Sequence, residues 1–257
     1  MSLDPIRIDI GHIPALYVPP ASPPARPRLA LFLTGFGGSK EAVVSHLRSF
    51  AAAGYLALSI DPYQHGERLH DASVDALRER ILANIRRHFW NILGRTTLEI
   101  PAVIDYAVNV LGCHDRVAIG GISMGGDISC AAAGIEPRIV AASCGIATPD
   151  WLRPGSFEPP GTPDSTAQAL YLRLNPITHP DHYAHCPAIT FQNGADDDRV
   201  PPEASVRFEN LLRDSHYRHS PERIEATLHA GISHAYPDVF LANTISWFLR
   251  YLPPTGD

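Results

Sequence analysis

The sequence lacks the features that would point to a nucleic acid or a membrane as its partner. Its 257 residues include 21 Lys and Arg against 27 Asp and Glu, a net charge of -6, and the basic residues are scattered. Such a balance gives no electrostatic attraction to a phosphate backbone or an anionic lipid surface. No stretch approaches the roughly 18 uncharged apolar residues of a membrane span. The first residues, MSLDPIRIDI, carry charges where a signal peptide needs an apolar segment, so we expect no leader there.

Cysteine is also scarce and irregularly placed. The four cysteines are Cys113, Cys130, Cys144 and Cys186, and none of them forms a Cys-x-x-Cys pair. Three lie among small residues or in strand-like stretches, where a free buried thiol is the common case. Reduced, structural thiols are typical of the cytoplasm, which is therefore the location we expect.

Apolar residues make up 45% of the chain and charged residues 19%, which is typical of a folded protein with a sizeable core. Residues 5–18 alternate apolar and polar, and this alternation predicts an antiparallel hairpin that turns near Gly11 and His12. The proline-rich residues 19–27 can neither pair nor coil regularly, so they indicate an exposed connector.

After this connector, short apolar runs alternate with helical stretches. The runs are RLALFL, YLALSI, RVAIGG, RIVAAS, PAITFQ and RIEATL. Between them the pattern predicts helices from about residue 41, over 74–111, from about 124, over 203–214 and at the end of the chain. Apolar runs that are continuous rather than alternating imply a mostly parallel sheet with helices on both faces. We therefore predict one α/β domain over residues 1–257.

Two stretches are longer than a simple crossover between parallel strands needs. Residues 61–112 hold a loop and two helices, and residues 145–186 are irregular and rich in Pro, Gly and Asp. The second stretch carries Trp151, Phe157 and Tyr171. A long irregular segment inside a compact domain is usually functional, so we interpret 145–186 as a small lid. The alternative is a surface excursion that its aromatic side chains merely pin down.

A serine lies between two glycines in Gly121-Ile122-Ser123-Met124-Gly125, directly after the apolar run RVAIG and before the small-residue stretch GGDISCAAA. A tight turn of small residues would explain this pattern without any chemistry. A strand, a sharp turn and a helix are, however, also the context of a nucleophile elbow, which holds a serine hydroxyl above the sheet. We favour Ser123 as a nucleophile.

A serine needs a base and a residue that orients the base. Three aspartates follow a later strand in AITFQNGADDDRVPP, and two histidines follow the next strand in IEATLHAGISHAYP. The order Ser, Asp, His is that of the α/β-hydrolase superfamily, which the chain resembles over nearly its whole length. The match of Gly194–Pro201 to the family's G-x-x-D-x-x-V-P loop places the acid on Asp197, although a slip of one residue stays open. The match of Gly231–His234 to its G-x-x-H turn makes His234 the base.

The same resemblance implies an oxyanion hole made of two backbone amides. One belongs to Met124, the residue after the nucleophile. The other belongs to Phe36, in a loop that resembles the family's H-G-x-x-G segment but has Thr34 in place of the histidine. A phosphate-binding loop is the weaker interpretation, because the motif lacks its GK[ST] ending.

Several other histidines are conspicuous in the sequence. His65 lies in Asp61-Pro62-Tyr63-Gln64-His65-Gly66-Glu67-Arg68, which resembles the D-x-x-x-H-G-x-R loop of esterase- and peptidase-like members, where the histidine braces the loop. His229 falls at a strand end and we expect it to be structural. The remaining three are spaced three residues apart, at His179, His182 and His185, and we expect a surface run rather than a metal site.

The resemblance implies a serine hydrolase that cleaves small carboxylic esters through an acyl-enzyme, without a cofactor or a metal. Its branch would be esterase-like or dienelactone-hydrolase-like, with a peptidase or thioesterase as the alternative activity. A ligand receptor without catalysis is a hypothesis from another class. We expect short acyl chains, bound by Phe36, Tyr63, Trp151 and Phe157, because a small lid leaves little room.

Overall fold

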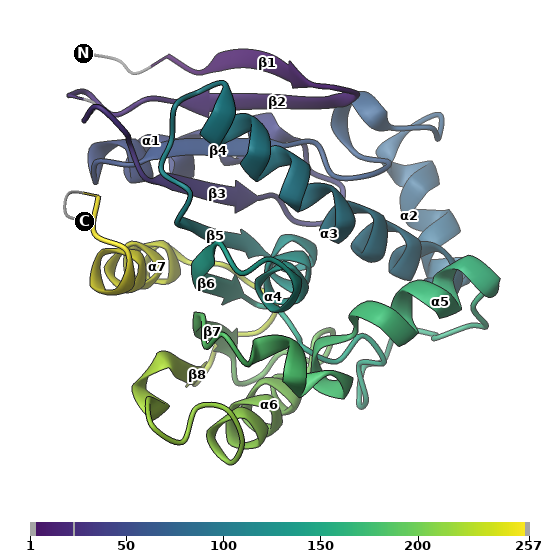
Figure 1. The fold of residues 1–257 in the computed structure, drawn as a ribbon. Coiled ribbons are helices and arrows are strands. Elements are labelled where there is room, and N and C mark those ends of the chain that lie inside the picture. Colours follow the sequence, from purple (N-terminus) through teal and green to yellow (C-terminus); the bar gives the residue numbers. More distant parts are fainter. Residues whose placement is uncertain (1–3, 23, 255–257) are drawn as a thin grey trace.

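A single mixed sheet organises the structure, a computed structural model that describes residues 4–22 and 24–254. The order of its eight strands is β1-β2-β4-β3-β5-β6-β7-β8. Their bounds are β1 Ile6–Ile10, β2 Ile13–Val18, β3 Leu29–Leu33, β4 Leu56–Ile60, β5 Val117–Ile122, β6 Ile139–Gly145, β7 Ala188–Gly194 and β8 Ile224–His229. β1 and β2 form an antiparallel hairpin, β2 also pairs antiparallel with β4, and all other pairs are parallel (Figure 1). The predicted hairpin and the mostly parallel sheet are thus confirmed.

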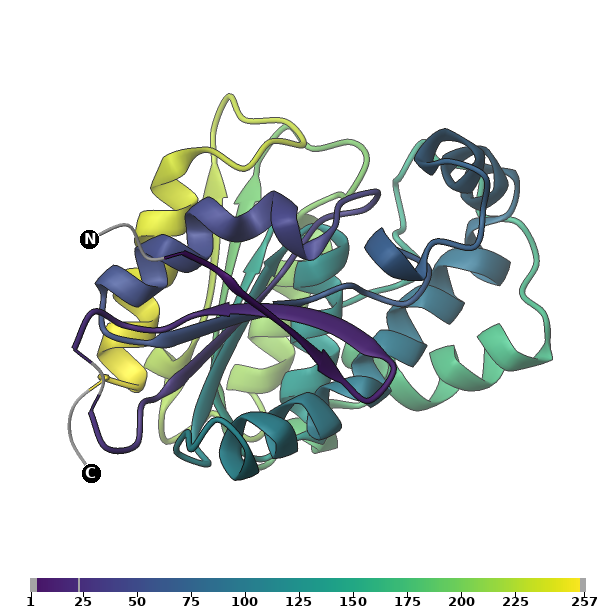
Figure 2. The ribbon, with the colours of Figure 1, turned by 90° about the horizontal axis from the view of Figure 1, so that it is seen from above.

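Helices cover both faces of this sheet (Figure 2). Their bounds are α1 Val44–Ala52, α2 Val74–Ala83, α3 Ile85–Asn109, α4 Met124–Ile135, α5 Ser165–Leu174, α6 Glu203–Arg213 and α7 Asp238–Tyr251. Helices α1 and α7 pack on one face in one apolar cluster, and α3, α4 and α6 contribute to the cluster on the other face. The fold is that of an α/β hydrolase, as the sequence predicted.

Strand β3 shows why the apolar runs are continuous. All five of its residues, LALFL, are buried. Leu29, Leu31 and Leu33 point into the cluster that contains α3 and α4, whereas Ala30 and Phe32 point into the cluster that contains α1 and α7. Because successive side chains of a strand face opposite sides, a sheet covered twice needs an apolar residue at every position.

Helices α2 and α5, one from each of the two long crossovers, lie beyond the edge of the sheet to which the parallel strands point (Figure 1). The first crossover holds α2 and α3, which confirms the two helices predicted there. The second holds an irregular segment followed by α5, and the ring of Tyr171 on α5 stacks on Trp90 of α3 with the centroids 4.3 Å apart. The second crossover is therefore anchored to the first, and α5 rests on α3.

Two features bear on the surroundings of the protein. None of the helices in the described ranges is both long enough and apolar enough to cross a bilayer. The cysteines carry free thiols, of which Cys113, Cys130 and Cys144 are buried and Cys186 is partly exposed.

Candidate active site

Ser123 stands in the turn between β5 and α4, with backbone angles φ 52° and ψ -113°. A positive φ strains any residue that has a Cβ atom, and such strain gathers at functional sites. The flanking glycines make the turn sterically possible. A Cβ on Gly121 would lie 2.5 Å from the carbonyl carbon of Gly125, and one on Gly125 would lie 2.5 Å from the oxygen of Leu33. A glycine at each position is therefore a packing requirement of the elbow.

The loops after β7 and β8 bring two further side chains to Ser123. The Ser123 Oγ lies 3.0 Å from Nε2 of His234, and Nδ1 of His234 lies 2.7 Å from Oδ2 of Asp197. Asp197 is buried, whereas its neighbours Asp196 and Asp198 are exposed. The structure thus joins the three predicted side chains in one hydrogen-bonded chain, and among the three aspartates Asp197 is the one that meets the histidine.

Asp197 is held as a carboxylate by its hydrogen bonds. Burial by itself would raise the pKa of Asp197, but the hydrogen bonds from His234 and from the amides of Val200 and Arg199 outweigh burial and lower it. The Val200 and Arg199 amides both donate to Oδ1, at 2.9 and 3.1 Å. Oδ2 is left for His234, so the loop keeps the Asp197 carboxylate charged and orients it toward His234.

The two residues predicted to supply oxyanion donors lie near Ser123: Met124 follows it in the chain, and Phe36 lines the same cavity. Met124 opens α4, where the first amides have no carbonyl partner within the helix. Phe36 lies in the loop after β3, next to Gly35, whose Cβ position is 3.4 Å from the oxygen of Ile122 and 4.0 Å from the Cβ of Ser123. The loop therefore reaches the elbow, and its backbone can approach closely because Gly35 has no side chain.

A buried ion pair anchors the far end of that loop. Lys40, the only lysine in the sequence, is 1% exposed. Its amide and its Nζ donate to the two oxygens of Asp61, both at 2.9 Å, and Asp61 belongs to the loop after β4. Burial would lower the pKa of Lys40, but hydrogen bonds to Glu67, Asp61 and Glu41 raise it. Lys40 thus stays charged and ties the two loops together.

The other histidines singled out in the sequence take no part in the chain of hydrogen bonds at Ser123. His65 is buried, its Nδ1 lies 3.1 Å from the Tyr63 carbonyl, and burial lowers its pKa. Its ring contacts Phe36 edge-on at 5.5 Å, in agreement with a bracing role. His229 bonds through Nε2 to the Gln192 side chain at 2.9 Å. Over the described ranges, no group of three or more His, Cys, Asp or Glu is arranged to hold a metal ion.

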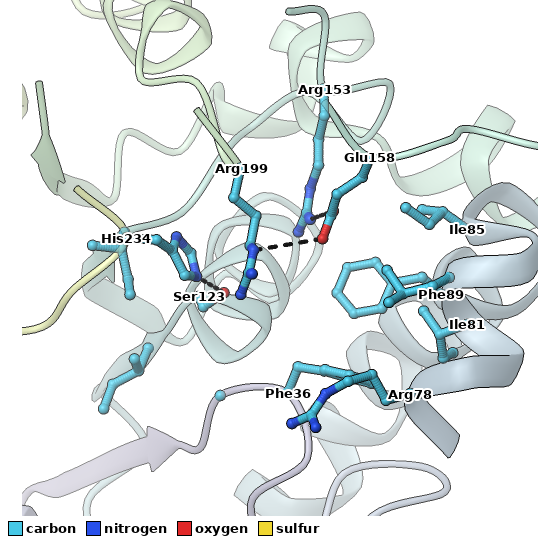
Figure 3. A pocket seen from close by; sticks show the side chains of 14 residues that line it. Phe36, Arg78, Ile81, Ile85, Phe89, Ser123, Arg153, Glu158, Arg199 and His234 are labelled. Carbon is cyan, nitrogen blue, oxygen red and sulfur yellow. Dashed lines mark hydrogen bonds and ion pairs between the residues drawn. The ribbon is translucent and has the colours of Figure 1, made fainter. Parts of the chain in front are cut away.

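A cavity of about 280 Å³ opens above Ser123 and His234 (Figure 3). Its apolar lining from the sheet edge consists of Phe36, Ile122 and Ile146. The opposite wall comes from the two long crossovers, and we call this wall the cover. The cover consists of Arg78, Ile81 and Leu82 of α2, Ile85 and Phe89 of α3, and Arg153 and Glu158 of the segment before α5. Arg199, from the Asp197 loop, also reaches the cavity.

Three of the four residues expected to bind substrate lie outside this cavity. Phe36 lines it, whereas Tyr63 lines two separate surface hollows beside Arg95. Trp151 is buried at 2% exposure, and its backbone carbonyl accepts a hydrogen bond from the Trp90 indole. Phe157 is 62% exposed and contacts Arg199 instead. The predicted lid segment does reach the cavity, but through Ile146, Arg153 and Glu158.

The apolar residues of α2 and α3 were missed as pocket residues in the sequence. Ile81, Ile85 and Phe89 recur at a spacing of four, which is also the signature of an ordinary core-facing helix. Nothing in the spacing distinguishes a helix face that packs on a sheet from one that overhangs a cavity. The unusual length of the 61–112 stretch was the feature of the sequence that could have indicated a role of α2 and α3 in the pocket.

The sheet order and the serine elbow define a hydrolase of the α/β-hydrolase superfamily. The profile of the prolyl oligopeptidase family matches residues 95–255, more than half of the chain, and the chain belongs to that family.

Individual proteins similar to the chain carry esterase names or share its fold. The chain is similar to YitV of Bacillus subtilis (strain 168), provisionally named as an esterase, with 26% identity over 238 residues that cover 87% of this chain and 89% of YitV. Esterase YjfP of Escherichia coli (strain K12) is 24% identical over 261 residues, which cover 95% of this chain and 97% of YjfP. The solved structure of TT1662 from Thermus thermophilus has the same fold, with a TM-score of 0.79, 21% identity and coverage of 98% of this chain and 99% of that one.

Proposed function

We propose that the protein is a serine esterase that cleaves small carboxylic esters through an acyl-enzyme. The observation that carries this proposal is the hydrogen-bonded chain from Ser123 through His234 to Asp197, at the base of a cavity that is open to a small substrate. A residue that only shaped a turn would need neither a base at 3.0 Å nor a buried carboxylate behind that base.

The geometry supports one role for each group. His234 accepts the Ser123 proton as the oxygen attacks the ester carbonyl, and it returns that proton to the leaving alcohol. Asp197 keeps His234 in the correct tautomer and stabilises the imidazolium. The amides of Phe36 and Met124 donate to the oxyanion of the tetrahedral intermediate. Water, deprotonated by His234, then releases the acid.

A short acyl group fits the cavity best. A volume of about 280 Å³ lies just below the range for small-molecule pockets, which is about 300–1,000 Å³. The names of YitV and YjfP support an ester rather than a peptide as substrate. The family to which the chain belongs supports a peptidase as the alternative, with the same three residues in the same roles.

Turnover of three substrate classes tests the proposal. We expect p-nitrophenyl acetate and butyrate to exceed aminoacyl p-nitroanilides and acyl-CoA thioesters in kcat/KM. Ser123→Ala should lower the esterase activity at least about 10⁴-fold, because the nucleophile is gone. A fluorophosphonate probe should label the native protein and not this variant. Labelling that persists in Ser123→Ala, or a preference for anilides, would overturn the assignment.

A further inference from the structure

The chain as a whole is acidic, whereas the charged residues that line the cavity are mostly basic. The protein carries a net charge of -6, yet Arg78, Arg153 and Arg199 line the cavity against a single carboxylate, Glu158. Arg78 sits on the far side of the cavity and pairs with the exposed Asp75 outside it. Figure 3 shows Arg153, Glu158 and Arg199 side by side along one wall of the cavity. Among the residues that line the cavity the cations thus outnumber the carboxylates, and such a lining favours an anion over a neutral ligand.

Arg153 is the arginine that the fold holds in place. Its Nη2 donates at 2.7 Å to Oδ2 of Asp127, which is fully buried in the first turn of α4. Asp127 also accepts the Thr148 amide at 2.8 Å, and its own amide bonds to the Ser123 carbonyl at 2.9 Å. The guanidinium carbon of Arg153 lies 4.8 Å from the centre of the Phe89 ring. Helix α4, through Asp127, and helix α3, through Phe89, thus contact this side chain from two sides.

The positive backbone angle φ of Arg153 indicates that surrounding contacts enforce the position of this residue. Arg153 has φ 49° and Ile146 has φ 44°, and both residues line the cavity. Positive φ values in residues with a Cβ atom persist only where the surrounding contacts enforce them, and such strain gathers at ligand sites. An arginine that served only as a surface charge would need neither the strain nor a buried partner.

The donors of Arg153 are incompletely used within the protein. A guanidinium has five N–H groups. Within the described ranges, the hydrogen bonds found for the guanidinium of Arg153 go to Asp127, at 2.7 Å, and to Glu158, at a long 3.3 Å. Glu158 is shared with Arg199, at 3.6 Å. Asp127 and Glu158 together use two of the five N–H groups, and because Arg153 lines the cavity, the remaining donors can bind a carboxylate of the substrate.

We infer that the acyl group of the substrate ends in a carboxylate that binds Arg153, with the scissile ester at Ser123 and the apolar chain between Ile85, Phe89 and Phe36. This inference rests on the proposed esterase function and adds the substrate class, a half-ester of a short dicarboxylic acid. The hydrogen bond to the buried Asp127 holds the Arg153 guanidinium in place in the free protein, so the binding site is formed before the substrate arrives.

The test compares half-esters with uncharged esters of equal chain length, using the native protein. The pairs are monomethyl glutarate with methyl pentanoate, monomethyl adipate with methyl hexanoate, and monomethyl pimelate with methyl heptanoate, each followed in a pH-stat. We expect the half-ester to be favoured in kcat/KM by about 10-fold or more at one chain length, as a charge-assisted hydrogen bond would give. Equal or lower kcat/KM for the half-esters at every length would overturn the inference.

Variants then assign the preference to Arg153. Arg153→Met should lower the ratio of half-ester to uncharged-ester kcat/KM by about 10- to 100-fold. Arg207→Met is the matched control, because it removes the same charge from an ion pair with Asp150 outside the cavity, and it should keep the native ratio. If Arg153→Met does not fold, the double variant Asp127→Asn/Arg153→Met removes the unpaired buried charge and carries the same expectation.

The outcomes separate the two proposals. Hydrolysis of neither ester class would contradict the esterase function itself. Hydrolysis of uncharged esters with no preference for half-esters would contradict only the carboxylate site. A native preference that Arg153→Met leaves unchanged would show that another arginine of the cavity binds the carboxylate, and the role given to Arg153 would be wrong.

Discussion

The loops that carry Ser123, Asp197 and His234 and the cover that faces them are built in different ways. Each loop directly follows a parallel strand, so a few local residues fix where its functional side chain points. The cover is assembled from α2 and α3, which follow each other in the chain, and from the segment before α5, which is distant in sequence and joins them through tertiary packing. The difference suggests that the chemistry of the site and its selectivity can be changed separately.

The largest effect should follow from a change in the loop after β7. We expect Asp197→Asn to lower kcat by roughly 10⁴-fold, because an amide favours the wrong histidine tautomer and removes the charge that stabilises the imidazolium. Asp196→Asn and Asp198→Asn are matched controls, since both side chains are exposed and neither bonds to His234. Steady-state kinetics of the three variants decides the matter. Greater sensitivity at Asp196 or Asp198 would place the acid one residue away.

The loop that carries Phe36 should be sensitive through its anchor. Lys40→Met leaves the buried carboxylate of Asp61 without its cation, and breaking a buried ion pair in this way costs about 3–5 kcal/mol. The double variant Lys40→Met/Asp61→Asn should recover part of that loss, because no buried charge remains. Urea unfolding of the native protein and both variants measures the effect. A double variant no more stable than Lys40→Met would mean that the pair does not act as a unit.

A smaller and selective effect is expected in the cover. Leu82 lines the cavity and is 40% exposed, whereas Leu152 is 41% exposed and lies outside it. Leu82→Ala should lower kcat/KM for p-nitrophenyl butyrate several-fold, since each methylene it no longer covers is worth up to about 0.8 kcal/mol. The same variant should lower kcat/KM for p-nitrophenyl acetate by a smaller factor. Leu152→Ala should leave kcat/KM for both esters unchanged. An equal loss in the two variants would mean that Leu82 does not contact the acyl chain.

The smallest effect concerns acid stability. The pKa of Asp197 is lowered in the folded protein, so its carboxylate stabilises the fold above the unfolded pKa of about 3.9. This contribution is lost as the pH falls through the lower, folded pKa. The stability difference between the native protein and Asp197→Asn should therefore be constant near neutrality and shrink below about pH 4. Thermal unfolding between pH 7 and pH 3 measures it, and a difference that grows in acid would contradict the lowered pKa.

The apolar patterns of the sequence predicted the sheet and the hairpin, and short motifs that resemble those of the superfamily predicted the side chains that meet at Ser123. Gly121 and Gly125 flank the serine for steric reasons that the motif itself records. Trp151 and Phe157 were misjudged as pocket residues because an aromatic residue in a long segment can face the core or the solvent as readily as a cavity. Arg153 was missed because its partner, Asp127, is distant in sequence, and charge pairing across a fold leaves no local pattern.

The strained backbone of Ser123 has a consequence for how the sequence can drift. Residues held in sparsely populated backbone regions cost about 1–3 kcal/mol, and glycine largely avoids that cost. Replacement by glycine would therefore favour the fold while it removed the hydroxyl. A descendant released from selection for hydrolysis would gain by making that exchange, so glycine at this position would mark a lineage that kept the architecture and abandoned the reaction.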